Sequence, residues 1–100
     1  MAERKVRISR EAAQDLDDIW DYTAQVWSPA QAETYITGIR RTIRTIGDMP
    51  EIGRVRPEIT PQVRTHPSAE HLIVYQFDDD TVTILRVLHK RRNWGAILSD

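Results

Sequence analysis

The chain has 100 residues, of which 40% are hydrophobic and 29% are charged, and its formal net charge at pH 7 is -1. This length and balance predict one globular domain over residues 1–100 and argue against a disordered chain. Because cysteine is absent and no long apolar run occurs, we exclude disulfides and thiolate metal sites and expect a cytoplasmic protein without a membrane span or secretion signal.

The charges are segregated along the sequence. Six acidic residues and no Lys or Arg lie between residues 11 and 33, whereas basic residues gather at 4–10, 40–44 and 86–92. The acidic run and the central basic run could offset each other on neighbouring helices. The C-terminal basic run has no comparable acidic neighbour in the sequence, so we expect a polarised surface.

A strand followed by an amphipathic helix is predicted at the start of the chain. Val6 and Ile8 alternate with polar residues, which indicates a short strand with one buried face. Ser9 is a plausible N-cap for the helix that follows. The apolar stripe of this helix comprises Ala12, Ala13, Leu16, Ile19, Trp20, Thr23 and Trp27. The expected solvated face carries Asp15, Asp18 and Asp21.

A second helix is predicted from Ser28-Pro29 to Gly47, because serine can cap it and proline suits its first position. Its apolar stripe comprises Ala32, Tyr35, Ile36, Ile39, Ile43 and Ile46. The short connection predicts an antiparallel helical hairpin. Gly38, inside this helix, either allows a close approach to another backbone or is merely tolerated.

The remainder of the chain has a β pattern. The proline-rich stretch 50–62 predicts an ordered loop without a regular element, and strands are predicted at 63–66, 71–77 and 81–89. The two long strands are apolar on both faces, which indicates that both faces are covered. Residues 90–98 could form a final short helix. The predicted fold class is α+β, in the order β-α-α-β-β-β(-α), with a helical hairpin packed on one face of a small, mostly antiparallel sheet.

This order of elements, over nearly the whole chain, resembles the ParE/RelE toxin superfamily, and in particular its ParE-like branch. The segments that carry the resemblance are Ile8-Ser9 followed by Ala12-Ala13-x-x-Leu16-x-x-Ile19-x-x-Tyr22, then Ala32-x-x-Tyr35, Met49-Pro50-x-x-Gly53, His71-Leu72-Ile73-Val74-Tyr75 and Arg86-Val87-Leu88-His89-x-Arg91-Arg92-x-Trp94. Each segment alone is weak, but their joint occurrence in this order is specific.

The resemblance implies the toxin of a type II toxin–antitoxin system. Members are neutralised by an antitoxin whose tail wraps the toxin and whose other end often binds operon DNA, so the implied partners are a ParD-like antitoxin and, through it, operator DNA. ParE-like members are described as poisons of DNA gyrase, whereas RelE-like members cut messenger RNA on the ribosome. The leading hypothesis is a non-enzymatic, gyrase-binding toxin. The alternatives are a RelE-like endoribonuclease and a degenerate member that retains only antitoxin binding.

RNA cleavage would need a general base, a proton donor and cations for the phosphate charge. The residues of suitable chemistry are Arg64, His66, Glu70, His71, Arg86, His89 and Arg91. The alternative nuclease set is Arg64, Arg86 and His89. RelE-like members resemble one another in a tyrosine within a basic C-terminal segment, yet no tyrosine follows Tyr75, and Trp94 cannot exchange protons near neutral pH. No phosphate loop, metal-ligand cluster or nucleophile elbow is present, so no cofactor or metal is expected.

Two binding surfaces are predicted instead of a catalytic site. The expected target-binding residues, which combine cations with an aromatic ring, are Arg86, His89, Lys90, Arg91, Arg92 and Trp94. The expected antitoxin-binding residues, beside the helical hairpin and an open sheet edge, are Leu16, Trp20, Tyr35 and Ile36.

Several of these residues have a structural alternative. Arg86 lies in an apolar strand, on the face opposite Leu85 and Val87, and must be paired or reach solvent. His89, whose cationic neighbours favour its neutral form, could instead be a structural histidine bonded to backbone. Trp94 could seal the core. The aromatic residues Trp20, Trp27, Tyr35 and Tyr75 are expected to serve packing or partner contact rather than catalysis.

Overall fold

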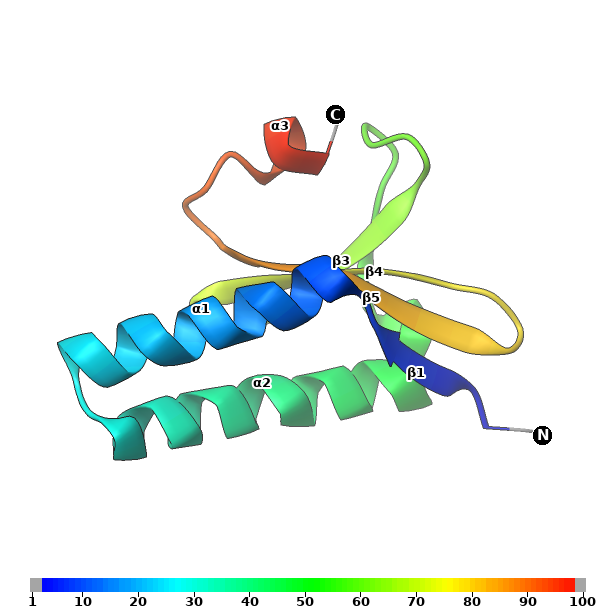
Figure 1. The fold of residues 1–100 in the computed structure, drawn as a ribbon. Coiled ribbons are helices and arrows are strands. Elements are labelled where there is room, and N and C mark those ends of the chain that lie inside the picture. The colour runs from blue at the N-terminus through cyan, green and yellow to red at the C-terminus, as the bar shows by residue number, and fades with distance from the viewer. Residues whose placement is uncertain (1–2, 99–100) are drawn as a thin grey trace.

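The computed structural model describes residues 3–98, which form a five-stranded sheet with a helical hairpin on one face (Figure 1). The elements are β1 (Lys5–Ile8), α1 (Arg10–Val26), α2 (Pro29–Asp48), the 3-10 helix η1 (Pro50–Ile52), β2 (Arg54–Arg56), β3 (Val63–Ser68), β4 (His71–Phe77), β5 (Thr81–His89) and α3 (Trp94–Leu98). The short helix α3 lies on the other side of the sheet from the hairpin (Figure 1). The predicted α+β fold is confirmed.

The strand order is β1-β5-β4-β3-β2, so the first and last strands of the chain are neighbours. β1 pairs with β5 in parallel, with Lys5 opposite Thr81 and Ile8 opposite Ile84, and every other pairing is antiparallel. Parallel neighbours need a crossover connection, and the helical hairpin is part of it. The hairpin therefore starts beside the sheet, because α1 begins directly after β1.

Side-chain caps begin both long helices where the sequence predicts. The Ser9 hydroxyl accepts a hydrogen bond from the Ala12 amide at 2.9 Å, and the Ser28 hydroxyl accepts one from the Gln31 amide at 3.0 Å. Each cap satisfies a backbone donor that has no partner within the helix. Pro29 occupies the first helical position of α2, where its missing N–H has no cost.

The core has a part on each face of the sheet. Between the hairpin and the sheet lie the buried residues Ala12, Leu16, Ile36, Ile39, Ile43, Ile46, Ile73, Tyr75, Val82, Ile84 and Val87. On the other face a smaller cluster comprises Ile59, Val63, Val74 and Leu88, and residues of α3 pack against it. The prediction that β4 and β5 are covered on both faces is confirmed.

The expectation of no regular element in 50–62 was wrong, because η1 and β2 lie there. β2 has only three residues, which is too short to show a period-two pattern, and it pairs with β3 from Arg54 opposite Thr65 to Arg56 opposite Val63. The segment is tied to the core by the buried Tyr75 hydroxyl, which donates to the Pro50 carbonyl at 2.7 Å and accepts from the Gly53 amide at 2.8 Å.

One further expectation was wrong, and one pair of alternatives is decided. The alternation of Val6 and Ile8 predicted a buried face, but these side chains are 42% and 39% exposed, because β1 is an edge strand whose outer side has no neighbour. Gly38 allows no close approach, since no heavy atom of the described chain outside its own stretch of helix and its chain neighbours lies within 4 Å of the position that a Cβ would take. Gly38 is therefore tolerated rather than required.

A β-bulge in β5 changes which side chains face the hairpin. Tyr75 pairs with Ile84 and Val74 pairs with Arg86, so Leu85 is an extra residue in the ladder. Beyond the bulge the alternation is shifted by one position. Val87 packs in the hairpin-side core while Leu85 packs against the other cluster, so the prediction that these two share a face was wrong.

The two contrasting glycines give a matched test of stability. Gly38→Ala should raise the free energy of unfolding by about 0.5–1 kcal/mol, because alanine favours the helix and meets no atom. Gly53→Ala should lower it by about 1–3 kcal/mol, because its Cβ would collide with the Tyr75 hydroxyl and disturb both hydrogen bonds. Urea denaturation of both variants checks this, and a shift in the same direction for both would contradict it.

Candidate functional site

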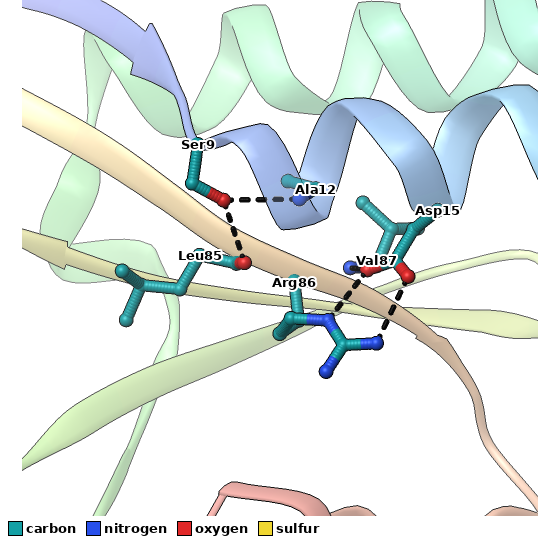
Figure 2. A network of polar contacts seen from close by, with 6 residues as sticks. All are labelled: Ser9, Ala12, Asp15, Leu85, Arg86 and Val87. Carbon is teal, nitrogen blue, oxygen red and sulfur yellow. Dashed lines mark hydrogen bonds and ion pairs between the residues drawn. The ribbon is translucent and has the colours of Figure 1, made fainter.

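An ion pair joins α1 to the bulged part of β5. Arg86 Nε lies 2.8 Å from Asp15 Oδ2, and Arg86 Nη2 donates to Asp15 Oδ1 at 3.0 Å (Figure 2). The Val87 amide also donates to Asp15 Oδ2 at 2.8 Å. The hydrogen bonds that Arg86 donates to Asp15 raise the pKa of Arg86 above its ordinary value, so its guanidinium stays charged.

This pair confirms that Arg86 is paired and corrects two other expectations. Asp15 was expected on a solvated helix face, but its side chain is only 12% exposed, because it turns toward β5. The C-terminal basic run was expected to lack an acidic neighbour, yet Arg86 has one from a distant part of the sequence. Nearby, the Ser9 hydroxyl donates to the Leu85 carbonyl at 2.8 Å (Figure 2). Arg86 therefore has a structural role, because it joins β5 to α1 through Asp15.

A chain of hydrogen bonds joins Glu70, Tyr35 and His71. The Glu70 amide donates to the Tyr35 hydroxyl at 3.1 Å, and that hydroxyl lies 2.7 Å from Nδ1 of His71. Since the hydroxyl accepts from Glu70, its own proton is free to point at Nδ1. With that proton donated to Nδ1, the neutral ring of His71 carries its own proton at Nε2.

His89 is held in the same tautomer by a different bond. The Arg91 amide donates to Nδ1 of His89 at 3.1 Å, which leaves Nε2 as the protonated nitrogen of the neutral ring. This is the backbone bond expected of a structural histidine. The rings of His71 and His89 pack edge to face at 5.3 Å between centroids. Burial, and secondarily the charge of His89, lower the pKa of His71 to about 4, against a smaller opposing effect of nearby carboxylates.

These rings lie at a groove of about 650 Å³ between the far half of α1 and the adjoining ends of β4 and β5. Its lining residues are Asp18, Ile19, Tyr22, Thr23, Trp27, Gln31, Tyr35, Glu70, His71, His89 and Arg92. Tyr22 and Trp27 are 67% and 74% exposed. Trp27 was expected either to pack in the core or to contact a partner, and its exposure shows that the core role was wrong. No spacing of residues in the sequence predicts that α1 and the two histidines lie together.

The predicted antitoxin-binding residues divide into two kinds. Leu16 and Ile36 are buried core residues and present little surface to a partner. Trp20 and Tyr35 are half-buried. The indole Nε1 of Trp20 donates to Glu33 across the hairpin at 3.3 Å, whereas Tyr35 lines the groove.

The predicted target-binding residues follow one another at the end of β5. The side chains of Lys90, Arg91 and Arg92 are exposed on a turn, and the turn is ordered by bonds from the Lys90 amide to Glu70 and from the Arg92 amide to His89, both at 3.0 Å. Trp94 is half-buried and packs against the smaller core cluster. The Cζ atom of the Arg56 guanidinium lies 4.8 Å from the centre of the Trp94 ring. Of the six residues, Lys90–Arg92 form the accessible cationic part.

The alternative nuclease set is not brought together. Arg64 donates to the backbone carbonyls of Glu51 and Gly53 at 3.2 and 3.0 Å. In the sheet Arg64 pairs with Tyr75, and Tyr75 pairs with Ile84. His89 lies five residues beyond Ile84 on β5, which is roughly 16 Å at the rise of a strand. Arg86 is bound to Asp15.

His66, another residue considered for RNA cleavage, lies on β3 and does not line the groove. Burial lowers the pKa of His66 on β3. In residues 3–98 no group of His, Asp or Glu could hold a metal ion, and in the same part of the chain no helix is long and apolar enough to cross a membrane.

The helical hairpin on a bulged, five-stranded sheet is a fold that also occurs in a solved protein. The solved chromosomal ParDE toxin–antitoxin system from P. aeruginosa contains a chain that matches this fold with a TM-score of 0.76 at 24% identity, over 87% of this chain and 96% of that one. The family of the ParE toxin of the type II toxin–antitoxin system parDE matches residues 6–94. This chain therefore belongs to the ParE toxin family, which confirms the resemblance seen in the sequence.

Two curated relatives agree. Toxin ParE1 of Caulobacter vibrioides is 37% identical over 92 residues, which is 92% of this chain and 95% of the relative. Toxin ParE1 of Mycobacterium tuberculosis is 34% identical over 85 residues, which is 84% of this chain and 87% of the relative. The similarity thus extends through both the hairpin and the sheet.

Removing the charge of Asp15 should destabilise the protein. Asp15→Asn should lower the free energy of unfolding by about 1.5–3 kcal/mol, because Arg86 loses a bidentate charged partner at a half-buried site. The control is Asp21→Asn, an exposed position on the same helix, which should change it by less than about 0.5 kcal/mol. Thermal and urea denaturation measure both, and equal effects would contradict the structural role of the pair.

The half-buried imidazole of His71 should make the free energy of unfolding depend on pH. Its folded pKa of about 4 lies below the ordinary value of 6.5, so the unfolded chain binds the proton more readily. Its contribution to stability is complete above pH 6.5 and falls as the pH drops toward 4. NMR titration should give a midpoint near 4 for His71, and His71→Gln should flatten the pH dependence of stability in this window. A His71 midpoint above 6 would contradict the assignment.

Proposed function

We propose that this protein is a growth-inhibiting toxin that binds DNA gyrase and is held inactive by a cognate, ParD-like antitoxin. Membership of the ParE toxin family supports the toxin role. The single observation that carries the target-binding surface is the ordered, exposed cationic turn Lys90–Arg92 at the end of β5.

The cationic turn suits a partner that carries negative charge. Its three side chains are adjacent, exposed and without an acidic partner in the described part of the chain. Their backbone is already held by hydrogen bonds to Glu70, directly before β4, and to His89 in β5, so binding has little ordering cost there. Such a surface attracts DNA phosphates or an acidic protein surface, both of which a gyrase–DNA complex would offer.

The positions of the polar residues support binding rather than RNA cleavage. Arg64 is bonded to backbone carbonyls near η1, and Arg86 is paired with Asp15. Neither guanidinium is placed beside His89, so these residues do not assemble the base, acid and cation that phosphodiester cleavage needs. In this proposal the toxin is not an enzyme and acts in the cytoplasm, where gyrase and chromosomal DNA are.

The antitoxin is proposed from the family and from a solved relative. The structural relative is described as a ParDE toxin–antitoxin system, and ParDE denotes a pair. By analogy, an antitoxin would cover part of this toxin and connect it to operator DNA through its own DNA-binding end.

Neutralising the cationic turn should abolish toxicity. The triple variant Lys90→Ala, Arg91→Ala and Arg92→Ala should bind purified gyrase at least about tenfold more weakly, because three favourable charge contacts are lost, and should restore growth on induction. The control is Arg40→Ala, Arg41→Ala and Arg44→Ala on α2, which removes the same charge from exposed positions elsewhere. Gyrase binding and growth should change little in the control.

The same expression experiment separates the alternatives. Induction should cause DNA damage before any loss of intact messenger RNA, and His89→Ala should keep most of the toxicity. If His89→Ala were folded but harmless and the purified toxin cut RNA, the endoribonuclease would replace the gyrase inhibitor. Growth without either effect would indicate a member that retains only antitoxin binding.

A further inference from the structure

Arg56, the last residue of β2, contacts both the sheet and the C-terminal helix α3. Its Nε donates to the Thr65 hydroxyl at 2.8 Å, and Thr65 is only 2% exposed. Its Cζ atom lies 4.8 Å from the centre of the Trp94 ring. A guanidinium at this distance is attracted to an indole, and the bond to Thr65 fixes its position. Arg56 therefore links β3 to the first residue of α3.

The helix α3 is too short to be stable by itself. It spans only Trp94–Leu98, and isolated helices of fewer than about 12–15 residues are marginal in water. Three of its side chains, Trp94, Ile97 and Leu98, pack against the smaller core cluster on the side of the sheet away from the hairpin (Figure 1). No residue of α3 is buried. Loss of the contact between Arg56 and Trp94 should therefore shift α3 toward an undocked state.

The cationic turn Lys90–Arg92 is held from two sides. On the side of the sheet, the Arg92 amide donates to the His89 carbonyl at 3.0 Å. On the side of α3, the Trp94 amide donates to the Arg92 carbonyl at 2.8 Å. A single residue, Asn93, separates Arg92 from α3, so the position of Trp94 limits where Arg92 can lie.

We propose that Arg56 is a positioning residue for the cationic turn: it holds the Trp94 ring, this ring docks α3, and the docked helix fixes the backbone at Arg92. The proposal rests on the proposed function, in which the turn binds the target. Arg56 acts through Trp94 rather than by its own contact with the target. The short strand β2 thereby gains a part in binding, because it carries Arg56 to α3.

The alternative is that Arg56 only adds to the stability of the whole domain. The contacts favour a local effect. Thr65 alternates with Val63 on the face of β3 that carries the smaller core cluster, and Trp94 packs against the same cluster. Both partners of the Arg56 side chain thus lie away from the main core between the hairpin and the sheet. Its removal should loosen α3 and the turn while the hairpin stays unchanged.

Hydrogen exchange of single amides, measured by NMR, tests the positioning. In Arg56→Ala the amides of Arg92 and Trp94 should exchange at least about fivefold faster than in the wild type, because the contact that docks α3 is lost. The Lys90 amide, which is bonded on the side of the sheet, and the amides of α1 and α2 should keep their rates. Unchanged rates at Arg92 and Trp94, or equal acceleration throughout the domain, would overturn the proposal.

The matched control is Arg54→Ala. Arg54 lies two positions earlier on the same strand, is exposed and carries the same charge. Its removal should leave the exchange rates of the turn and of α3 at their wild-type values. Acceleration equal to that in Arg56→Ala would mean that net charge, and not the contact with Trp94, holds the turn, and would overturn the proposal.

Two conservative variants separate charge from packing. Arg56→Lys keeps a cation for the Trp94 ring but loses the Nε bond to Thr65, so its exchange rates should lie between those of the wild type and Arg56→Ala. Arg56→Met keeps an apolar stem without charge and should behave like Arg56→Ala. Wild-type rates in Arg56→Met would show that packing alone docks α3 and would overturn the role of the cation.

Binding of purified gyrase tests the link to function. Arg56→Ala should bind about fivefold more weakly than the wild type, in step with the loosened turn, and Arg54→Ala should bind as the wild type does. A loosened turn with unchanged gyrase binding would overturn the link between Arg56 and the target. If the wild-type toxin bound no gyrase, the proposed target would fail, and the exchange rates would still decide whether Arg56 positions the turn.

Discussion

The Asp15 carboxylate accepts from both Arg86 and the Val87 amide, and the position of α1 depends on this contact. The bulge at Leu85 interrupts regular pairing in β5, and α1 supplies partners there through Asp15 and the Ser9 hydroxyl. A half-buried ion pair gives modest net stability, since desolvation offsets much of the attraction. Its larger effect is directional, because bidentate geometry allows few orientations of the helix over the sheet.

The groove follows from that orientation. With α1 anchored near its first turns, its far half continues along the sheet to the ends of β4 and β5, and the hairpin connection projects outward (Figure 1). Tyr22 and Trp27, near the end of α1, line the groove beside these strand ends and remain 67% and 74% exposed. Beyond the bulge, the altered phase of β5 turns His89 toward His71 and the hairpin.

Much of the fold could be predicted from the sequence because its signals are local. Ser9 and Ser28 cap helices at the expected places, and the apolar stripe expected for α2 matches its buried residues except for the half-buried Tyr35. In α1 only Ala12 and Leu16 of the expected stripe are buried, and Ala13 and Trp27 are exposed. The functional surface could not be predicted in the same way. Pairing of Asp15 with Arg86 spans 71 positions, and the bulge at Leu85 leaves no mark in a strand that is apolar on both faces. Tyr35 was expected to serve packing or partner contact, and its bond to His71 joins positions 36 residues apart, which no local pattern indicates.

The extra residue in β5 also affects how relatives are compared. One residue inserted into a strand reverses the parity of every position after it, so the same letter points to opposite faces in chains with and without the bulge. An alignment that places a gap a few residues away from Leu85 would equate His89 with a residue on the wrong face. The C-terminal segment of related chains should therefore be superposed from the turn after β5 backwards, before differences in their specificity are assigned to single residues.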